Sequence, residues 1–117
     1  MKYLSILLLL MGAAACNSAG TRPPATRSAA DSVLQSDILR PVTDSIKLFP
    51  DNHELYYRRA LLLFNTNPAL ALADFEKAAK LLPGNTDYWA GAGEAALLIS
   101  DYKKAAACFQ QALTTAP

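Results

Sequence analysis

The side chains that could carry out chemistry are few in this sequence, and they stand far apart along the chain. His53 is the single histidine, and Cys16 and Cys108 are the two cysteines. A zinc site takes about four ligands, and a nucleophilic triad needs a histidine beside its nucleophile. His53 has neither a second histidine nor a cysteine close enough in sequence to complete such a set. At a predicted helix start beside an acidic residue, it is predicted to be solvated.

Other familiar signals of an enzyme are also missing from the sequence. Gly91 and Gly93 come closest to a glycine-rich phosphate loop, but they lie inside a helical pattern that no strand precedes. The carboxylates are scattered without a convincing acid–base pair. Cys108 lies in an alanine-rich segment, which is typical of a buried small apolar side chain. The sequence therefore predicts a protein that is not an enzyme and holds no metal or other cofactor.

The charge balance argues against nucleic acid as a partner. The chain has 11 basic residues against 10 acidic ones. Lys2 lies in the N-terminal apolar segment, which carries no acid, so the rest of the chain has 10 of each sign and a net charge of zero. Binding to a phosphate backbone depends on a field of basic side chains, and no such field is present.

The first fifteen residues have the parts of a secretory signal peptide. Lys2 precedes an apolar run over residues 4–15 that ends in three alanines before Cys16. The run is shorter than the roughly 18 to 20 residues that a membrane-spanning helix needs. We therefore expect residues 1–15 to direct export and to be removed.

The small residues directly before Cys16 resemble the lipobox of bacterial lipoproteins. The resemblance implies that Cys16 becomes the first mature residue and carries lipid chains, which would anchor the protein to a membrane. Ala13 departs from the leucine most common in that family, and ordinary signal-peptidase cleavage to a soluble periplasmic product is the alternative. Asn17, in place of the aspartate linked to inner-membrane retention in some bacteria, weakly favours the outer membrane. Residues 16–30 hold no large apolar residue, which predicts a flexible tether.

From residue 31 onward the apolar spacing is helical, and no stretch alternates with a period of two. Asp51 with Glu54 resembles a capping box, and Asn67 with Pro68 supplies a cap and a first-turn proline. Further helices are expected from near Thr86 and from near Asp101. The predicted fold class is all-α, with about five helices after the signal segment.

The helical part repeats itself. Ala71, Phe75, Ala78 and Pro83 recur 34 residues later as Ala105, Phe109, Ala112 and Pro117. A unit of this length, with two helices and this pattern in the second, resembles the tetratricopeptide repeat. Trp89 and Gly93 stand at the Trp and Gly positions of the family, whereas Leu55 and Arg59 replace them in the first unit. The resemblance implies a superhelix of helix pairs, with repeats over residues 51–84 and 85–117.

The ends of the array are predicted to differ from the repeats. Residues 31–50 resemble a degenerate half-repeat in which Ile38, Val42 and Ser45 stand 33 residues before Ala71, Phe75 and Ala78. Pro41 should kink or restart that helix. At the other end, the last helix is expected to expose apolar side chains such as Leu113. We therefore expect either that the array continues or that a partner covers this face.

The resemblance divides the singled-out residues into two groups. The large rings are expected to fill holes left by small residues where helices cross. The predicted repeat core is Ala71, Phe75, Ala78, Trp89, Gly93, Ala105, Phe109 and Ala112. In tetratricopeptide proteins the first helix of each unit lines a concave groove. That position implies a partner-binding face formed by His53, Tyr56, Ala60, Leu63 and Phe64 and by Asp87, Ala90, Glu94, Leu97 and Leu98.

These observations predict a protein-binding role. The implied groove is apolar and aromatic and lacks the Lys/Asn set with which some family members hold a terminal carboxylate. It is therefore expected to bind an apolar or helical segment of a protein, unless its residues only pack against further helices. The favoured function is a membrane-tethered, non-catalytic interaction scaffold of the bacterial cell envelope. The alternatives are the non-catalytic front part of a longer envelope enzyme or transport accessory protein, and a soluble periplasmic peptide-binding module.

Overall fold

The computed structural model describes residues 28–117, and within this range the chain is entirely helical. Residues 1–15, Cys16 and the predicted tether up to residue 27 lie outside the described residues. The all-α prediction is confirmed for the described part, which has one helix more than expected. The helices are α1 (Ala29–Leu34), α2 (Arg40–Leu48), α3 (His53–Leu63), α4 (Pro68–Leu81), α5 (Thr86–Leu98) and α6 (Tyr102–Thr115).

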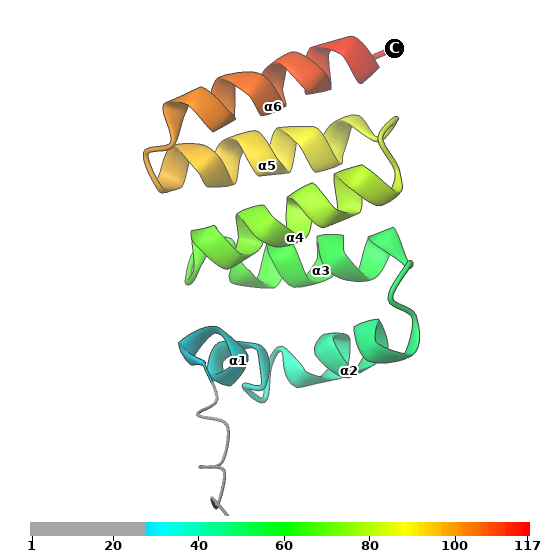
Figure 1. The fold of residues 1–117 in the computed structure, drawn as a ribbon, viewed down its shortest axis with the longest axis vertical. Coiled ribbons are helices and arrows are strands. Elements are labelled where there is room, and N and C mark those ends of the chain that lie inside the picture. Colours follow the sequence, from blue (N-terminus) through cyan, green and yellow to red (C-terminus); the bar gives the residue numbers. More distant parts are fainter. Residues whose placement is uncertain (1–27) are drawn as a thin grey trace, which may run out of the picture.

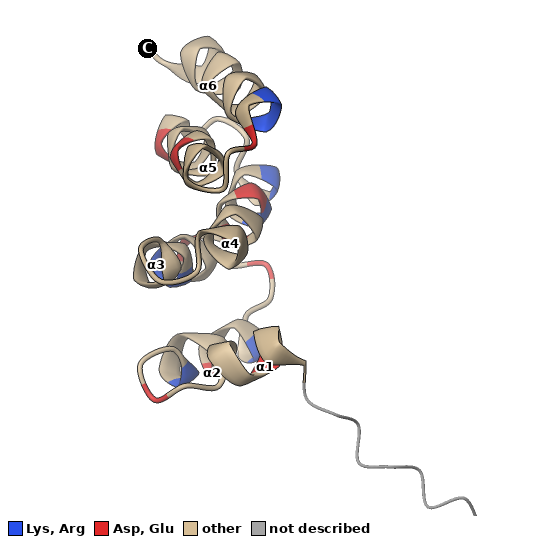
Figure 2. Ribbon diagram, turned by 90° about the vertical axis from the view of Figure 1, so that its left-hand side faces the viewer, with Lys and Arg blue, Asp and Glu red and all other residues tan. Residues whose placement is uncertain are grey.

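The helices are stacked in chain order, so that each of the last four packs against its neighbour in sequence (Figure 1). The helix α3 forms an antiparallel pair with α4, and α5 forms a second pair with α6. Seen from the side, α3 and α5 lie in one layer, and α4 and α6 lie in the other (Figure 2). None of the helices over residues 28–117 is long and apolar enough to cross a membrane.

Polar side chains fix where the long helices begin. The carboxamide oxygens of Asn52, Asn67 and Asn85 accept hydrogen bonds from backbone N–H groups of the first turns of α3, α4 and α5. Pro68 follows Asn67 at the first helical position, as predicted. The expected capping box of Asp51 and Glu54 is wrong. The cap is Asn52, whose side chain accepts from the Glu54 N–H at 3.1 Å.

The repeat in the second helix of each pair is confirmed by burial. Ala71, Phe75 and Ala78 in α4 are almost completely buried, and Ala105 and Ala112 in α6 are buried at the equivalent positions. Phe109 is half-buried, because no described helix follows α6. The 34-residue spacing therefore holds between α4 and α6.

The first helices of the two pairs follow a different spacing. The buried residues of α3 are Tyr56, Arg59, Ala60 and Leu63, and they match Trp89, Ala92, Gly93 and Ala96 of α5 at a spacing of 33 residues. The prediction that Leu55 and Arg59 stand at the Trp and Gly positions is therefore wrong by one residue. Those positions belong to Tyr56 and Ala60.

The extra residue of the second pair lies in its turn. Eight residues separate Leu63 from Ala71, whereas nine separate Ala96 from Ala105. Ser100, in the turn between α5 and α6, has a φ of 62°, a left-handed conformation that lets the chain reverse in a short space. The Asp101 N–H then donates to the Ala96 carbonyl at 2.9 Å, and the Asp101 side chain caps α6.

The N-terminal helices show a similar displacement by one residue. The buried residues here are Leu39, Thr43 and Ile46, whereas the predicted Ile38 is 75% exposed. The expected positions Val42 and Ser45 are only partly buried. The predicted helix is also broken between α1 and α2, and Pro41 restarts it as a first-turn proline.

A buried ion pair joins α3 to α4. The Arg59 Nε and Nη2 atoms donate to the two carboxylate oxygens of Asp74 at 2.7 and 2.9 Å. Arg59 also donates to the Thr43 hydroxyl on α2 at 3.4 Å and lies over the ring of Tyr56. Both charged side chains are about one-tenth exposed. The pair thereby holds three helices around one guanidinium group.

Two glycines of α5 let the helices approach closely, and their substitution should have unequal effects. A Cβ atom at Gly91 would lie 2.5 Å from Phe75, whose side chain is enclosed, and one at Gly93 would lie 2.7 Å from Phe109. Phe109 is half-buried at the edge of the stack and can move aside. Alanine gains up to about 1 kcal/mol of helix propensity, whereas overpacking costs about 1–3 kcal/mol. We expect Gly91→Ala to be clearly destabilising and Gly93→Ala to be close to neutral.

Urea unfolding of the two variants, followed by circular dichroism, measures this difference. Equal losses of stability would show that Phe109 is held as firmly as Phe75.

Candidate functional site

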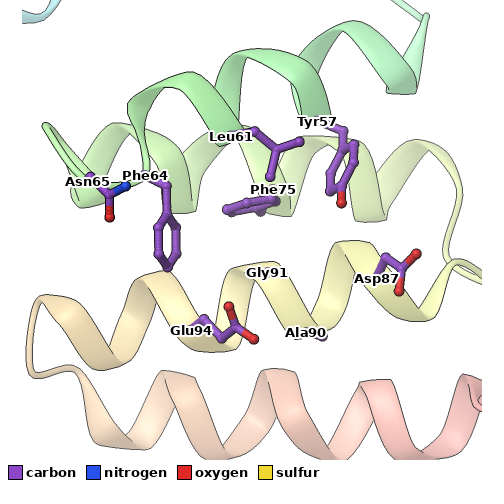
Figure 3. A pocket seen from close by; sticks show the side chains of 9 residues that line it. All are labelled: Tyr57, Leu61, Phe64, Asn65, Phe75, Asp87, Ala90, Gly91 and Glu94. Atoms are coloured by element: carbon purple, nitrogen blue, oxygen red, sulfur yellow. The ribbon is translucent and has the colours of Figure 1, made fainter.

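The site with the clearest shape lies between the first helices of the two pairs. A surface pocket of about 270 Å³ opens where α3 faces α5. Figure 3 shows Phe75 of α4 at the centre of the pocket, between side chains of α3 and α5. The residues that line it are Tyr57, Leu61, Phe64, Asn65, Phe75, Asp87, Ala90, Gly91 and Glu94.

Aromatic contacts hold one side of this pocket in place. The ring of Phe75 contacts that of Tyr57 at a centroid distance of 5.8 Å and that of Phe64 at 6.3 Å. Tyr57 also contacts Tyr88 at 5.0 Å, and Tyr88 contacts His53 at 5.6 Å. Such tilted ring pairs are favourable beyond the area that they bury. The five rings form a continuous row from the start of α3 to its end.

His53 has a more specific environment than predicted. Its Nδ1 atom lies 2.6 Å from the Tyr88 hydroxyl, so a hydrogen bond joins the start of α3 to the start of α5. Burial raises the pKa of Tyr88, which keeps its hydroxyl protonated near neutral pH. The prediction of a solvated His53 is therefore wrong, since the ring is half-buried and bonded. The bond fixes the entry to the groove between the two helices.

The predicted binding face is only partly assembled by the structure. Phe64, Asp87, Ala90 and Glu94 line the pocket as expected. Leu97 and Leu98 are about half exposed near the end of α5, outside the pocket lining. Tyr56, Ala60 and Leu63 are buried in the core and do not face the groove, which corrects their prediction.

The cause is the one-residue displacement in α3. A shift of one residue turns a helix position by about 100°, which moves it from the groove into the core. The groove residues of α3 are therefore Tyr57, Leu61, Phe64 and Asn65, three of which the sequence analysis missed. The missed signal was chemical: aligning Tyr56 with Trp89 and Ala60 with Gly93 would have matched ring with ring and small with small.

The predicted core residues lie where packing requires them. Gly93, like Ala71, Ala78, Ala105 and Ala112, is buried, and Phase-defining rings occupy the spaces between helices. Trp89 is half-buried, and its indole N–H donates to the Pro83 carbonyl at 2.8 Å. Phe75 serves twice, because it fills the core and also forms a wall of the pocket.

Comparisons with protein families, with curated proteins and with solved structures gave no match. The site must therefore be judged on its own chemistry. Among residues 28–117, no group of three or more His, Cys, Asp or Glu side chains is placed to hold a metal ion.

A second pocket lies on the opposite layer, beside α4 and α6, and contains Cys108. It has a volume of about 520 Å³, and Lys104 of α6 is bonded across it to Glu76 of α4 at 2.7 Å. This hydrogen bond raises the pKa of Lys104, so the amine stays charged. Burial raises the pKa of the Cys108 thiol, which therefore stays protonated at neutral pH and is a poor nucleophile. Its environment fits a packing role.

Proposed function

We propose that this chain is a non-catalytic protein-interaction scaffold of the bacterial cell envelope, tethered to a membrane through lipid on Cys16. The observation that carries the binding role is the pocket between α3 and α5, which is lined by rings and apolar side chains and opens to the surface. A pocket of this kind on a stack of helix pairs suits a side chain of a docked protein segment. The tether is supported by the sequence around Cys16 alone.

We also propose that the two helix pairs belong to the tetratricopeptide class of right-handed superhelices. Small residues where α5 crosses its neighbours, namely Gly91 and Gly93, lie against the rings of Phe75 and Phe109. Close crossings of this kind are the feature that the repeat pattern of the family specifies. The stacked order of the helices, with first helices in one layer and second helices in the other, supports the same class (Figure 2).

Partner binding can be tested by site-specific photo-crosslinking in intact cells. A photoreactive residue at Leu61, in the groove, is expected to give adducts with an envelope protein. The same residue at the exposed Lys80, on the other layer, should not give them. Ala90→Trp should fill the pocket and remove the adduct, whereas Ala73→Trp, on an exposed position of α4, should leave it. An adduct that forms equally from both positions would contradict the proposed groove.

The lipid anchor makes a separate prediction. Cys16→Ser should move the protein from the washed membrane fraction to the soluble periplasmic fraction, because the acyl chains that hold it would no longer be attached. Immunoblotting of the fractions measures the change, and mass spectrometry of the mature N-terminus reports the acyl chains directly. A Cys108→Ser variant is the matched control and should remain with the membrane. Retention of Cys16→Ser in washed membranes would refute the anchor.

A further inference from the structure

We infer that the pocket between α3 and α5 receives basic side chains, Lys or Arg, from a helical segment of the partner. This inference rests on the proposed function, since it names the chemistry of the segment that the groove would bind. Three observations carry it: the charge of the pocket lining, the rings that lie beside those charges, and the size of the pocket.

The pocket lining carries negative charge and no positive charge. Asp87 and Glu94 are its ionisable carboxylates, and no Lys or Arg is among the lining residues. The ion pairs in the described part of the chain use other acids, namely Asp37, Asp44, Glu54, Asp74 and Glu76. Figure 2 shows the acidic residues of α5 on the side turned away from α6, whose basic residues lie on the opposite side. The two carboxylates therefore lack an intramolecular counter-charge among residues 28–117.

Helix stability accounts for only one of these acids. Asp87 lies in the first turn of α5, where a negative charge interacts favourably with the helix dipole. Glu94 lies in the third turn, where that interaction has faded. Its position beside Phe64 at the far end of the pocket has no role in the packing of the stack (Figure 3).

The rings beside the carboxylates strengthen the preference for a cation. Phe64 lies at the Glu94 end of the pocket, Tyr57 lies towards the Asp87 end, and Phe75 lies between them (Figure 3). The faces of aromatic rings attract Lys and Arg, and the long aliphatic stems of these residues pack on apolar surface while the charged group reaches a carboxylate. A wholly apolar guest would instead cover the two carboxylates without offering them a hydrogen-bond donor, which is unfavourable. An acidic guest would be repelled.

The size and spacing of the site fit side chains of a helix. The volume of about 270 Å³ lies below the range of about 300–1,000 Å³ that is usual for small-molecule pockets. Asp87 and Glu94 are seven residues apart on one face of α5, so they are separated by about 10 Å along the helix. Two basic residues seven positions apart on a partner helix have the same separation. The site therefore suits a pair of basic side chains in this register.

Peptide binding to the full-length protein tests the inference. The probe is a capped, alanine-rich helical peptide with two guest residues seven positions apart, which are both Lys, both Gln or both Glu. Fluorescence anisotropy with a labelled peptide measures the affinity at low and at physiological salt. We expect the Lys peptide to bind at least about fivefold more tightly than the Gln peptide, and the Glu peptide to bind most weakly. Added salt should reduce the difference.

Matched variants assign the preference to the two acids. The double variant Asp87→Asn, Glu94→Gln should bring the Lys and Gln peptides to within about twofold of each other. Asp51→Asn, an exposed acid outside the pocket, should leave the ranking unchanged. Equal affinities for the three peptides, or no binding of any, would overturn the inference. If crosslinking from Leu61 still captured its partner, the proposed scaffold role would survive that result.

Discussion

Replacing Asp74 with alanine is expected to lower the free energy of unfolding by about 3–5 kcal/mol, because Arg59 would then be buried without a counter-charge. The guanidinium group is bonded to both oxygens of Asp74 and has otherwise only the Thr43 hydroxyl at 3.4 Å. A domain of this size has about 5–15 kcal/mol in total, so the loss is a large fraction of its stability. Urea unfolding monitored by circular dichroism gives the difference directly.

The ion pair between Glu76 and Lys104 provides the control. It has a similar short distance of 2.7 Å, but its side chains are 27% and 40% exposed. Glu76→Ala should therefore cost less than about 1 kcal/mol. The double variant Arg59→Met, Asp74→Leu should recover most of the stability lost in Asp74→Ala, because it removes both buried charges together. A loss as small as that of Glu76→Ala would mean that water reaches Arg59 in solution.

Replacing Phe75 with alanine is expected to cost about 3–5 kcal/mol, since it leaves a cavity at the centre of the stack. Phe75 is 1% exposed, and its ring contacts those of Tyr57 and Phe64. The same substitution removes a wall of the groove, so crosslinking from Leu61 should be lost with it. Thermal or urea unfolding measures the first effect.

Two further variants make the result specific. Phe49→Ala removes an equally large ring that is 61% exposed, and its effect should stay within about 0.5 kcal/mol. Phe75→Leu preserves much of the buried volume and should cost less than about 1.5 kcal/mol. If Phe75→Ala were as mild as Phe49→Ala, the helices would have to close the cavity, and the packing described for α4 and α5 would be incorrect.

The second helices of the pairs were predictable because their packing depends on residues that hold the same positions in both copies. Ala71 and Ala105, like Phe75 and Phe109, are identical at the same spacing, so the sequence alone identified them. Helix starts marked by an amide side chain, such as Asn67, were also legible, because capping is a local interaction. These features depend on neighbours within one helix or on an unbroken repeat.

The first helix of the first pair was harder to place, because its register depends on the length of a turn. Carrying the 34-residue spacing through to α3 put Leu55 and Arg59 where the structure has Tyr56 and Ala60. Nothing local to α3 corrected the error, since its apolar residues occur on more than one side of the helix. The buried Arg59 added to the ambiguity, because a charged residue usually marks the solvent-exposed face of a helix. Only its partner Asp74, fifteen residues later, explains its burial.

The hydrogen bond from Arg59 to Thr43 has a consequence for how such an array can evolve. It ties the first helix pair to α2, whereas the second pair has Ala92 in place of Arg59 and Cys108 in place of Asp74. If the two pairs exchanged places through recombination, Ala92 would leave a void beside Thr43. Arg59 would then be buried beside the apolar residues of α4. The order of the two pairs is therefore fixed by side chains inside the stack, and the repeats can no longer be shuffled as equivalent copies.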